Sequence, residues 1–235
     1  MKGKSFGTKL AFVKKTKQLL FIFCVVLNSL AIQAQEFGSK FRLDTRINGL
    51  VPHPLSNKAL TNTFVGVYTV SGSENIHLFR EFFVGIHGEN SVYKVPTNKI
   101  VATNGYRLSD LFQLNSVGLN VGYDYYFSAT GFLSTSVSLG ESFGKFTAIE
   151  MVKPVPVNNT FNAGYVQVTS NINFTLEDHM GIGFLVSYTY VNYSFNPYDI
   201  ALNQFRGYSD SDVKGAISHI EVGFNLFFAY VKKNK

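Results

Sequence analysis

From Phe37 onward, hydrophobic and polar residues alternate one by one through long stretches of the chain. Successive side chains of a strand point to opposite faces, so this alternation predicts strands with one apolar and one polar face. Eight such strands are expected, at Phe37–Asn48, Asn62–Ser71, Asn75–Gly88, Gln113–Phe127, Gly131–Gly144, Ala163–Leu176, His179–Phe195 and Lys214–Val231. The connections between them alternate between long and short, beginning with a long one.

The two faces separate clearly in the predicted strand Gln113–Phe127. One face carries Val117, Leu119, Val121, Tyr123 and Tyr125, and the other carries Ser116, Gly118, Asn120, Gly122 and Asp124. A soluble sandwich or a lipocalin shows the same alternation, so alternation alone does not separate these folds from a membrane barrel.

Strand length favours the membrane. Several predicted strands run for 12 to 17 residues. Soluble strands cluster near about 5 or 6 residues, and a tilted strand that crosses a bilayer needs about 9 to 11. Tyr and Phe gather towards strand ends, as in Tyr123–Phe127 and Tyr188–Phe195, where an interfacial aromatic girdle would lie. The sequence therefore predicts an all-β fold, an eight-stranded antiparallel up-and-down transmembrane β-barrel.

The last predicted strand carries a pattern typical of an assembly signal. Glu221 is a polar residue, Gly223 follows two positions later, and Leu226 and Phe228 continue at alternate apolar positions. This pattern resembles the C-terminal assembly signal of outer-membrane proteins. It departs from that signal because Val231–Lys235 extends past the usual aromatic terminus.

With the strand rhythm and this terminal strand, the chain resembles the small eight-stranded outer-membrane barrels of the OmpA-transmembrane and opacity-protein type, including the outer-membrane β-barrel proteins of Bacteroidetes. The resemblance extends over residues 35–235 and is one of pattern. It implies an architecture and an outer-membrane location, and it specifies no activity, because one fold carries many functions.

The segment Met1–Ala34 reads as a secretory signal peptide. Six lysines precede an apolar run of 14 residues, Leu19–Ile32, and Ala34 offers a small residue for cleavage before Gln35. The run is short for a membrane anchor, which needs about 20 apolar residues. We expect a barrel domain at 35–235, in the cell outer membrane, with its mature N-terminus at Gln35.

Removing this segment changes the charge and the cysteine count. The whole chain has 21 basic and 15 acidic residues, and without the six lysines the rest carries 15 of each. A neutral chain gives no support to nucleic-acid binding. Cys24, the only cysteine, lies in the apolar run, so no disulfide is expected in the barrel domain.

Charged residues on the polar faces predict an ion-pair network inside the barrel. The candidate members are Lys40, Arg42, Asp44, Arg46, Asp124, His219 and Glu221. Barrel closure sets the first strand beside the last, so Arg42 or Arg46 is expected to reach Glu221. Eight strands enclose an interior only wide enough for side chains, and buried charges must be paired. A structural network is favoured over ion conduction along it.

No catalytic, cofactor or metal site is predicted. The five histidines lack the H-x-x-x-H spacing of a metal site and are interpreted as structural or solvated. Ser218, His219 and Glu221 superficially resemble a lipid-enzyme cluster, but alternation turns Ser218 towards lipid and the other two inward. The chain is therefore not expected to be an enzyme.

The long connections define the expected recognition surface. They are Gly49–Thr61, Glu89–Phe112, Lys145–Asn162 and Asn196–Val213. The leading hypothesis is a non-enzymatic outer-membrane barrel with a structural or surface-interaction role through these extracellular loops. Its expected partners are outer-membrane lipid, the barrel assembly machinery and a surface ligand. A narrow channel for small solutes or ions and a lipid-modifying barrel enzyme are the alternatives.

Overall fold

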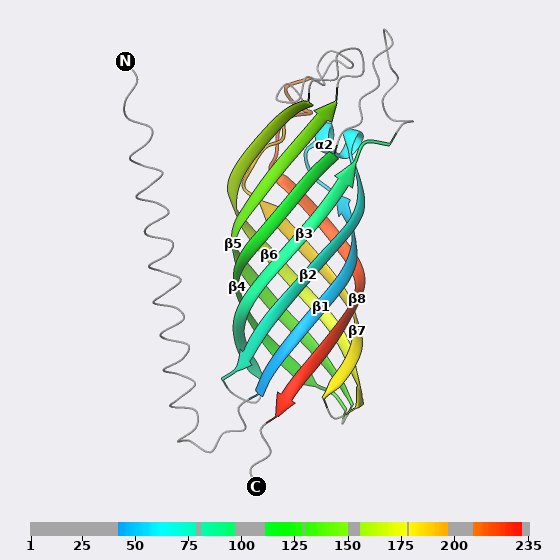
Figure 1. Ribbon diagram of the computed structural model, residues 1–235, viewed down its shortest axis with the longest axis vertical. Coiled ribbons are helices and arrows are strands. Elements are labelled where there is room, and N and C mark those ends of the chain that lie inside the picture. Colours follow the sequence, from blue (N-terminus) through cyan, green and yellow to red (C-terminus); the bar gives the residue numbers. More distant parts are fainter. Residues whose placement is uncertain are drawn as a thin grey trace, which may run out of the picture. The chain divides into compact units, whose positions relative to one another are not determined.

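The computed structural model describes residues 42–78, 81–96, 111–128, 130–149, 156–177, 179–196 and 209–231, which form a closed barrel of eight antiparallel strands (Figure 1). The strands are β1 (Arg42–Pro54), β2 (Val65–His77), β3 (Phe82–Lys94), β4 (Leu111–Tyr126), β5 (Gly131–Ile149), β6 (Pro156–Glu177), β7 (Met180–Val191) and β8 (Ile217–Val231). Each strand pairs with its neighbours in sequence, and β1 pairs with β8 to close the sheet. The predicted fold class is confirmed. The signal segment 1–34, Gln35 and Lys40 lie outside the described residues.

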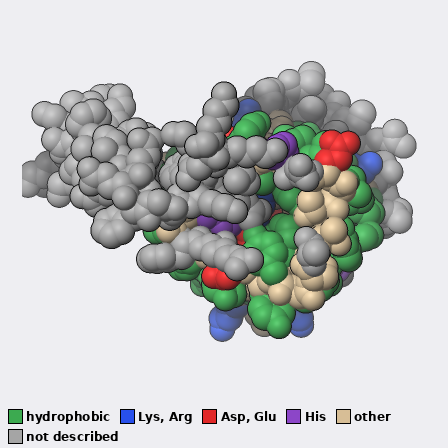
Figure 2. Space-filling view, turned by 90° about the horizontal axis from the view of Figure 1, so that it is seen from below, with side chains coloured by type: hydrophobic (Ala, Val, Ile, Leu, Met, Phe, Trp, Pro, Cys, Tyr) green, Lys and Arg blue, Asp and Glu red, His purple; other side chains and the backbone are tan. Residues whose placement is uncertain are grey.

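The outer wall of the barrel is apolar. Among its exposed side chains are Ile47, Val70, Ile86, Leu119, Val121, Leu139, Val168, Ile172, Phe184, Val222 and Phe224. Viewed from the end at which β1 begins, hydrophobic side chains make up much of the visible wall (Figure 2). Glu74 interrupts this surface on β2, where the Thr45 hydroxyl donates to its carboxylate at 2.9 Å. An apolar surface of this extent is not stable in water, which argues against the soluble alternative.

Among the described residues, no helix is long and apolar enough to cross a membrane.

The predicted turn after Ser71 is wrong. Ser71, Gly72 and Ser73 lie inside β2 and pair with both β1 and β3. Small polar residues resemble a turn in sequence, but here Ser71 is buried and polar side chains of this size fit the narrow interior. The connection falls instead between His77 and Phe82, where the Leu78 N–H donates to the Phe82 carbonyl at 3.0 Å.

The predicted long connections are shorter than expected, because the strands on either side extend into them. Residues 49–54 belong to β1, and residues 89–94 belong to β3, with Glu89 buried inside the barrel. The hairpin of β5 and β6 is paired up to Ile149 and Pro156. These two strands have 19 and 22 residues, against about 9 to 11 needed to cross a bilayer. Exposed Lys145 and Asn162 therefore lie beyond the apolar part of the wall.

A short helix lies where the predicted loop Gly49–Thr61 meets the predicted strand that begins at Asn62, so the first two residues of that predicted strand are helical. Helix α2 (Lys58–Thr63) begins after Asn57, whose side-chain oxygen accepts from the Leu60 N–H at 3.1 Å. Asn57 has a φ of 61°, a left-handed conformation that asparagine tolerates better than most residues. Its amide also donates to the Phe195 carbonyl at 2.9 Å. The helix is thereby held at the end of the barrel where β1 ends (Figure 1).

Candidate functional site

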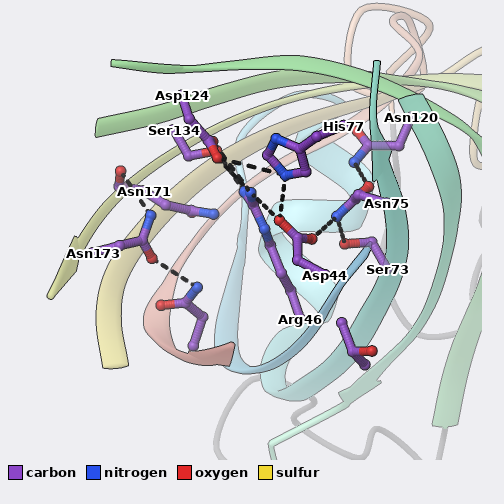
Figure 3. A network of polar contacts seen from close by, with 12 residues as sticks. Asp44, Arg46, Ser73, Asn75, His77, Asn120, Asp124, Ser134, Asn171 and Asn173 are labelled. Carbon is purple, nitrogen blue, oxygen red and sulfur yellow. Dashed lines mark hydrogen bonds and ion pairs between the residues drawn. The ribbon is translucent and has the colours of Figure 1, made fainter. Parts of the chain in front are cut away.

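The barrel interior contains an ion-pair network near the end at which β1 begins. Arg46 Nη2 lies 2.9 Å from Asp44 Oδ2 and 3.2 Å from Asp124 Oδ1. His77 Nε2 lies 2.8 Å from Asp44 Oδ2, and the guanidinium also donates to Ser134. These side chains come from β1, β2, β4 and β5 and point toward one another (Figure 3). One arginine bridges two carboxylates, so this cluster, called the lower network, ties together strands far apart in sequence.

A second buried polar cluster, the upper network, contains two glutamates. Glu221 accepts hydrogen bonds from the hydroxyls of Thr69 and Ser187, each at 2.7 Å. Glu89 accepts from Gln167 Nε2 at 2.6 Å. His219 Nε2 lies 3.4 Å from Glu221 Oε1 and 3.9 Å from Glu89 Oε1, and none of these three residues is more than 6% exposed.

A small polar cavity is lined by residues of the barrel's middle, among them Asn48, Ser71, Asn120 and Asn171. Its volume is about 20 Å³. One water needs about 10 to 15 Å³ measured in this way. The cavity can therefore hold a single water and forms no continuous path.

The end of the barrel near α2 is filled by hydrophobic side chains, which we call the aromatic plug. The plug consists of Ala59, Leu60, Phe64, Tyr93, Phe112, Leu114, Phe146, Phe161, Tyr165, Val191, Phe195 and Ile217. Phe64 lies at its centre, with ring centroids 5.9 Å from Phe112, 5.9 Å from Phe146 and 5.7 Å from Phe195. Alternation predicts a packed polar interior, and the plug corrects that prediction at this end of the barrel.

The signal for the plug is present in the sequence. Phe112 and Leu114 have the same parity as Ser116 and Asn120, which line the interior further along β4. The face that is polar inside the membrane therefore becomes apolar towards this end. Phe112 fell at the end of the predicted connection Glu89–Phe112, so its place in the barrel interior was not predicted.

The predicted network residues divide between the two clusters. Asp44, Arg46 and Asp124 meet in the lower network, and His219 and Glu221 meet in the upper one. Arg42 pairs through its backbone with His77 and Val231, and its side chain, like Lys40, lies outside the described residues.

The predicted contact between Arg46 and Glu221 is not formed. In the β1–β8 register, Arg46 stands opposite Phe227, whereas Glu221 stands opposite Pro52. At about 3.3 Å per residue, six positions along a strand separate the two side chains by about 20 Å. Arg46 is instead neutralised by Asp44 and Asp124, which lie at its own level.

The predicted exposure of Ser218 also needs correction. Ser218 is 3% exposed, and its hydroxyl donates to Ser56 Oγ at 2.7 Å, because the chain after β1 covers it. Its hydrogen bond therefore goes to Ser56 and not to His219. This arrangement lacks the bond between nucleophile and base that serine catalysis uses.

His77, His87 and Glu89 belong to the buried networks but are not among the residues predicted from the sequence. The structure brings two groups of potential metal ligands together, Asp44 with His77 and Asp124, and Glu89 with His219 and Glu221. The ligands of the first group come from three different strands, and Glu89 of the second group comes from β3 while His219 and Glu221 share β8, so no spacing within one segment shows a whole group. Two short signals do exist, His87-x-Glu89 and His219-x-Glu221, because residues two apart in a strand share a face.

The predicted assembly-signal residues lie in the closing strand. A side chain at Gly223 would meet the Gly49 carbonyl oxygen at 2.1 Å, so β1 leaves no room there for a larger residue. Leu226 and Phe224 are exposed on the outer wall, and Phe228 is half-buried. Their part in assembly stays a prediction.

A closed eight-stranded barrel with an apolar outer wall and a filled, ion-paired interior defines an outer-membrane β-barrel fold. A major outer-membrane protein from Thermus thermophilus has a similar structure, with a TM-score of 0.51, 8% identity, and coverage of 80% of this chain and 99% of that one. At this identity the likeness bears on the fold alone.

Two further solved barrels are similar at lower scores. Neisserial surface protein A has a TM-score of 0.46 and 11% identity, covering 80% of this chain and 96% of that one. The attachment invasion locus protein Ail of Yersinia pestis has a TM-score of 0.44 and 9% identity, covering 81% and 99%. No protein-family model matches the chain, and a comparison with curated proteins gives no match.

Proposed function

We propose that this protein is an integral outer-membrane barrel with a closed interior, which acts through the connections at the α2 end. The aromatic plug is the observation that carries the proposal. Phe64 and Leu60 are each 1% exposed and pack against side chains from opposite walls of the barrel. A closed interior leaves the outer connections as the surface for a ligand.

The extended β5–β6 hairpin supports the same proposal. Its outward side chains are apolar at Leu139 and Val166 but polar at Lys145 and Asn162. This change marks the place where the hairpin leaves the lipid, and the rest of it presents paired strands to the solvent. The signal segment supports an outer-membrane location, and the closing strand supports recognition by the barrel assembly machinery.

A narrow channel is the second candidate, favoured by the polar side chains around the middle of the barrel. Purified protein in a planar bilayer is expected to give no steady unit currents, because the aromatic plug and the lower network each close the interior. A variant with Leu60→Ser and Phe64→Ser weakens only the plug and is expected to stay silent. Its matched control is Val70→Ser, on the outer wall.

Steady unit currents from the wild-type protein would contradict the closed interior and favour the channel. Currents from the plug variant alone would show that the lower network does not close the barrel by itself. Mass spectrometry of lipid A from cells with and without the gene tests the lipid-modifying alternative.

The proposed topology predicts where a protease cuts. Proteinase K added to intact cells is expected to cut within 150–155 or 197–208, which connect β5 to β6 and β7 to β8 at the α2 end. The short turns at Ala129 and Asp178 are expected to stay intact until the cells are opened. Immunoblotting of the fragments measures both. Cleavage at the short turns in sealed cells would reverse the orientation.

A further inference from the structure

The upper network differs from the lower one in how its charges are balanced. Asp44 and Asp124 share the guanidinium of Arg46 in the lower network. Among the described residues, the salt bridges of Glu89 and Glu221 are to histidines alone. Their closest hydrogen-bond donors are neutral groups from Thr69, Ser187 and Gln167. A pair of buried carboxylates costs several kcal/mol unless a cation, either a protonated histidine or a metal ion, lies beside it.

The histidines of the upper network make no hydrogen bonds to these glutamates. Both ring nitrogens of His219 lack a hydrogen-bond partner, although the side chain is 1% exposed. His87 Nε2 also lacks one and lies 3.6 Å from Glu89 Oε2. In the lower network, by contrast, His77 Nε2 forms a hydrogen bond with Asp44 Oδ2 at 2.8 Å. The imidazole of His219 is therefore aimed at two carboxylates without bonding either of them.

One distance around His219 matches that between the ligands of a tetrahedral metal ion, and the other is a few tenths of an ångström longer. The three facing atoms, one each from Glu89, His219 and Glu221, lie within 4.8 Å of one another. His219 Nε2 is 3.4 Å and 3.9 Å from the two carboxylate oxygens. A tetrahedral site with bonds of about 2.0 to 2.2 Å separates its ligand atoms by about 3.3 to 3.6 Å.

We propose that Glu89, His219 and Glu221 bind one divalent transition-metal ion of the zinc class inside the barrel. The ion balances the two glutamate charges and uses the free Nε2 lone pair of His219. Carboxylate and imidazole donors suit zinc and its neighbours in the transition series. His87 Nε2, 3.6 Å from Glu89 Oε2, offers a further nitrogen donor. Thr69, Ser187 and Gln167 hold the carboxylates in place, as supporting hydrogen bonds do around metal ligands.

The site lies against the aromatic plug, since the rings of His219 and Tyr93 are 5.9 Å apart and Tyr93 stacks on Phe112 at 5.1 Å. An ion is therefore expected to enter while the barrel folds. It would also link β3 to β8, two strands that do not pair with each other. The proposed function does not depend on this site. A conductance or topology result that contradicts the proposed function leaves the metal site standing, and failure to bind an ion leaves the proposed function standing.

Refolding with Co²⁺ tests the site, because tetrahedral Co²⁺ absorbs visible light strongly. The full chain is refolded into detergent micelles with Co²⁺ or Zn²⁺, passed over a chelating column, and analysed by absorbance and elemental analysis. Wild-type protein is expected to retain one ion per chain. His219→Gln and Glu221→Gln are expected to bind at least about 100-fold more weakly, since even supporting residues cost about 10 to 100-fold.

His77→Gln is the matched control, because it removes a buried histidine from the lower network. It is expected to retain one ion per chain. Heat-modifiable gel mobility confirms that each variant is folded, and Glu89→Gln replaces any ligand variant that does not fold. Failure of the folded wild-type barrel to retain an ion would overturn the proposal. So would undiminished binding by a folded ligand variant, or a loss in His77→Gln equal to that in His219→Gln.

Discussion

Arg46→Met is expected to lower the free energy of unfolding by about 3 to 5 kcal/mol, because it leaves buried carboxylates without their cation. Asp44 and Asp124 are 1% and 0% exposed, so water cannot replace the guanidinium. The substitution also removes the contact of Arg46 Cζ with the Phe83 ring, at 4.6 Å. Methionine fills much of the same volume as arginine, so the lower free energy of unfolding is caused mainly by the removal of the charge.

Unfolding in urea from detergent or lipid vesicles measures this loss. The chain has no tryptophan, so heat-modifiable gel mobility or circular dichroism replaces tryptophan fluorescence. Adding Asp124→Asn to Arg46→Met is expected to recover part of the stability, because one unpaired carboxylate charge is removed. Lys145→Met, an exposed cation on β5, is the control and is expected to change stability by less than about 0.5 kcal/mol. Equal effects at Arg46 and Lys145 would contradict a stabilising lower network.

The fold was predictable because it depends on a local property. Each strand repeats the same alternation of apolar and polar residues, and a closed barrel is the arrangement that satisfies every backbone hydrogen bond in lipid. The turn after Ser71 was misplaced because serine and glycine favour turns in water and also fit a narrow barrel interior. Alternation indicates which face a residue lies on, but it does not indicate where the strand ends.

The interior was predictable only in part, because its contacts depend on the register between strands. Parity placed Arg46 and Glu221 on the inward face, but their distance follows from which residues stand opposite each other across β1 and β8. Glu89 was assigned to a loop, so its partners on β8 could not be inferred. Helix α2 is held by Asn57 and by residues more than 130 positions later in the chain, a contact that no local pattern shows.

A barrel that contains a plug and two separate buried networks differs in its mechanical properties from a barrel with a uniform polar interior. In the lower network Arg46 links β1 to β4 and His77 adds β2, and the aromatic plug ties α2 to the opposite wall. Both sets of contacts join strands that are not neighbours in sequence. Such contacts resist changes in the cross-section of the barrel, as the proposed role of its outer connections requires.

Val121→Arg and Leu139→Arg are each expected to lower the free energy of unfolding into lipid by about 2 to 4 kcal/mol. Val121 is 43% exposed and Leu139 is 55% exposed, both on the outer wall of neighbouring strands. Below them on β4 the outward residues become Tyr123 and Tyr125, which mark the interface. An arginine at either aliphatic position must therefore enter hydrocarbon or distort the bilayer around it.

Tyr125→Arg is the matched control, because it places the same charge on the same strand close to the interface. Its expected cost is about 0 to 1 kcal/mol, since the charge can reach the headgroups. Urea unfolding from lipid vesicles compares the three variants, and refolding into detergent micelles repeats the comparison without a bilayer. The difference between Val121→Arg and Tyr125→Arg should shrink in micelles, which adapt their thickness to the protein. An equal cost at both positions in vesicles would mean that depth in a bilayer does not govern this surface, and the apolar outer wall would then require another explanation, such as burial against a protein partner.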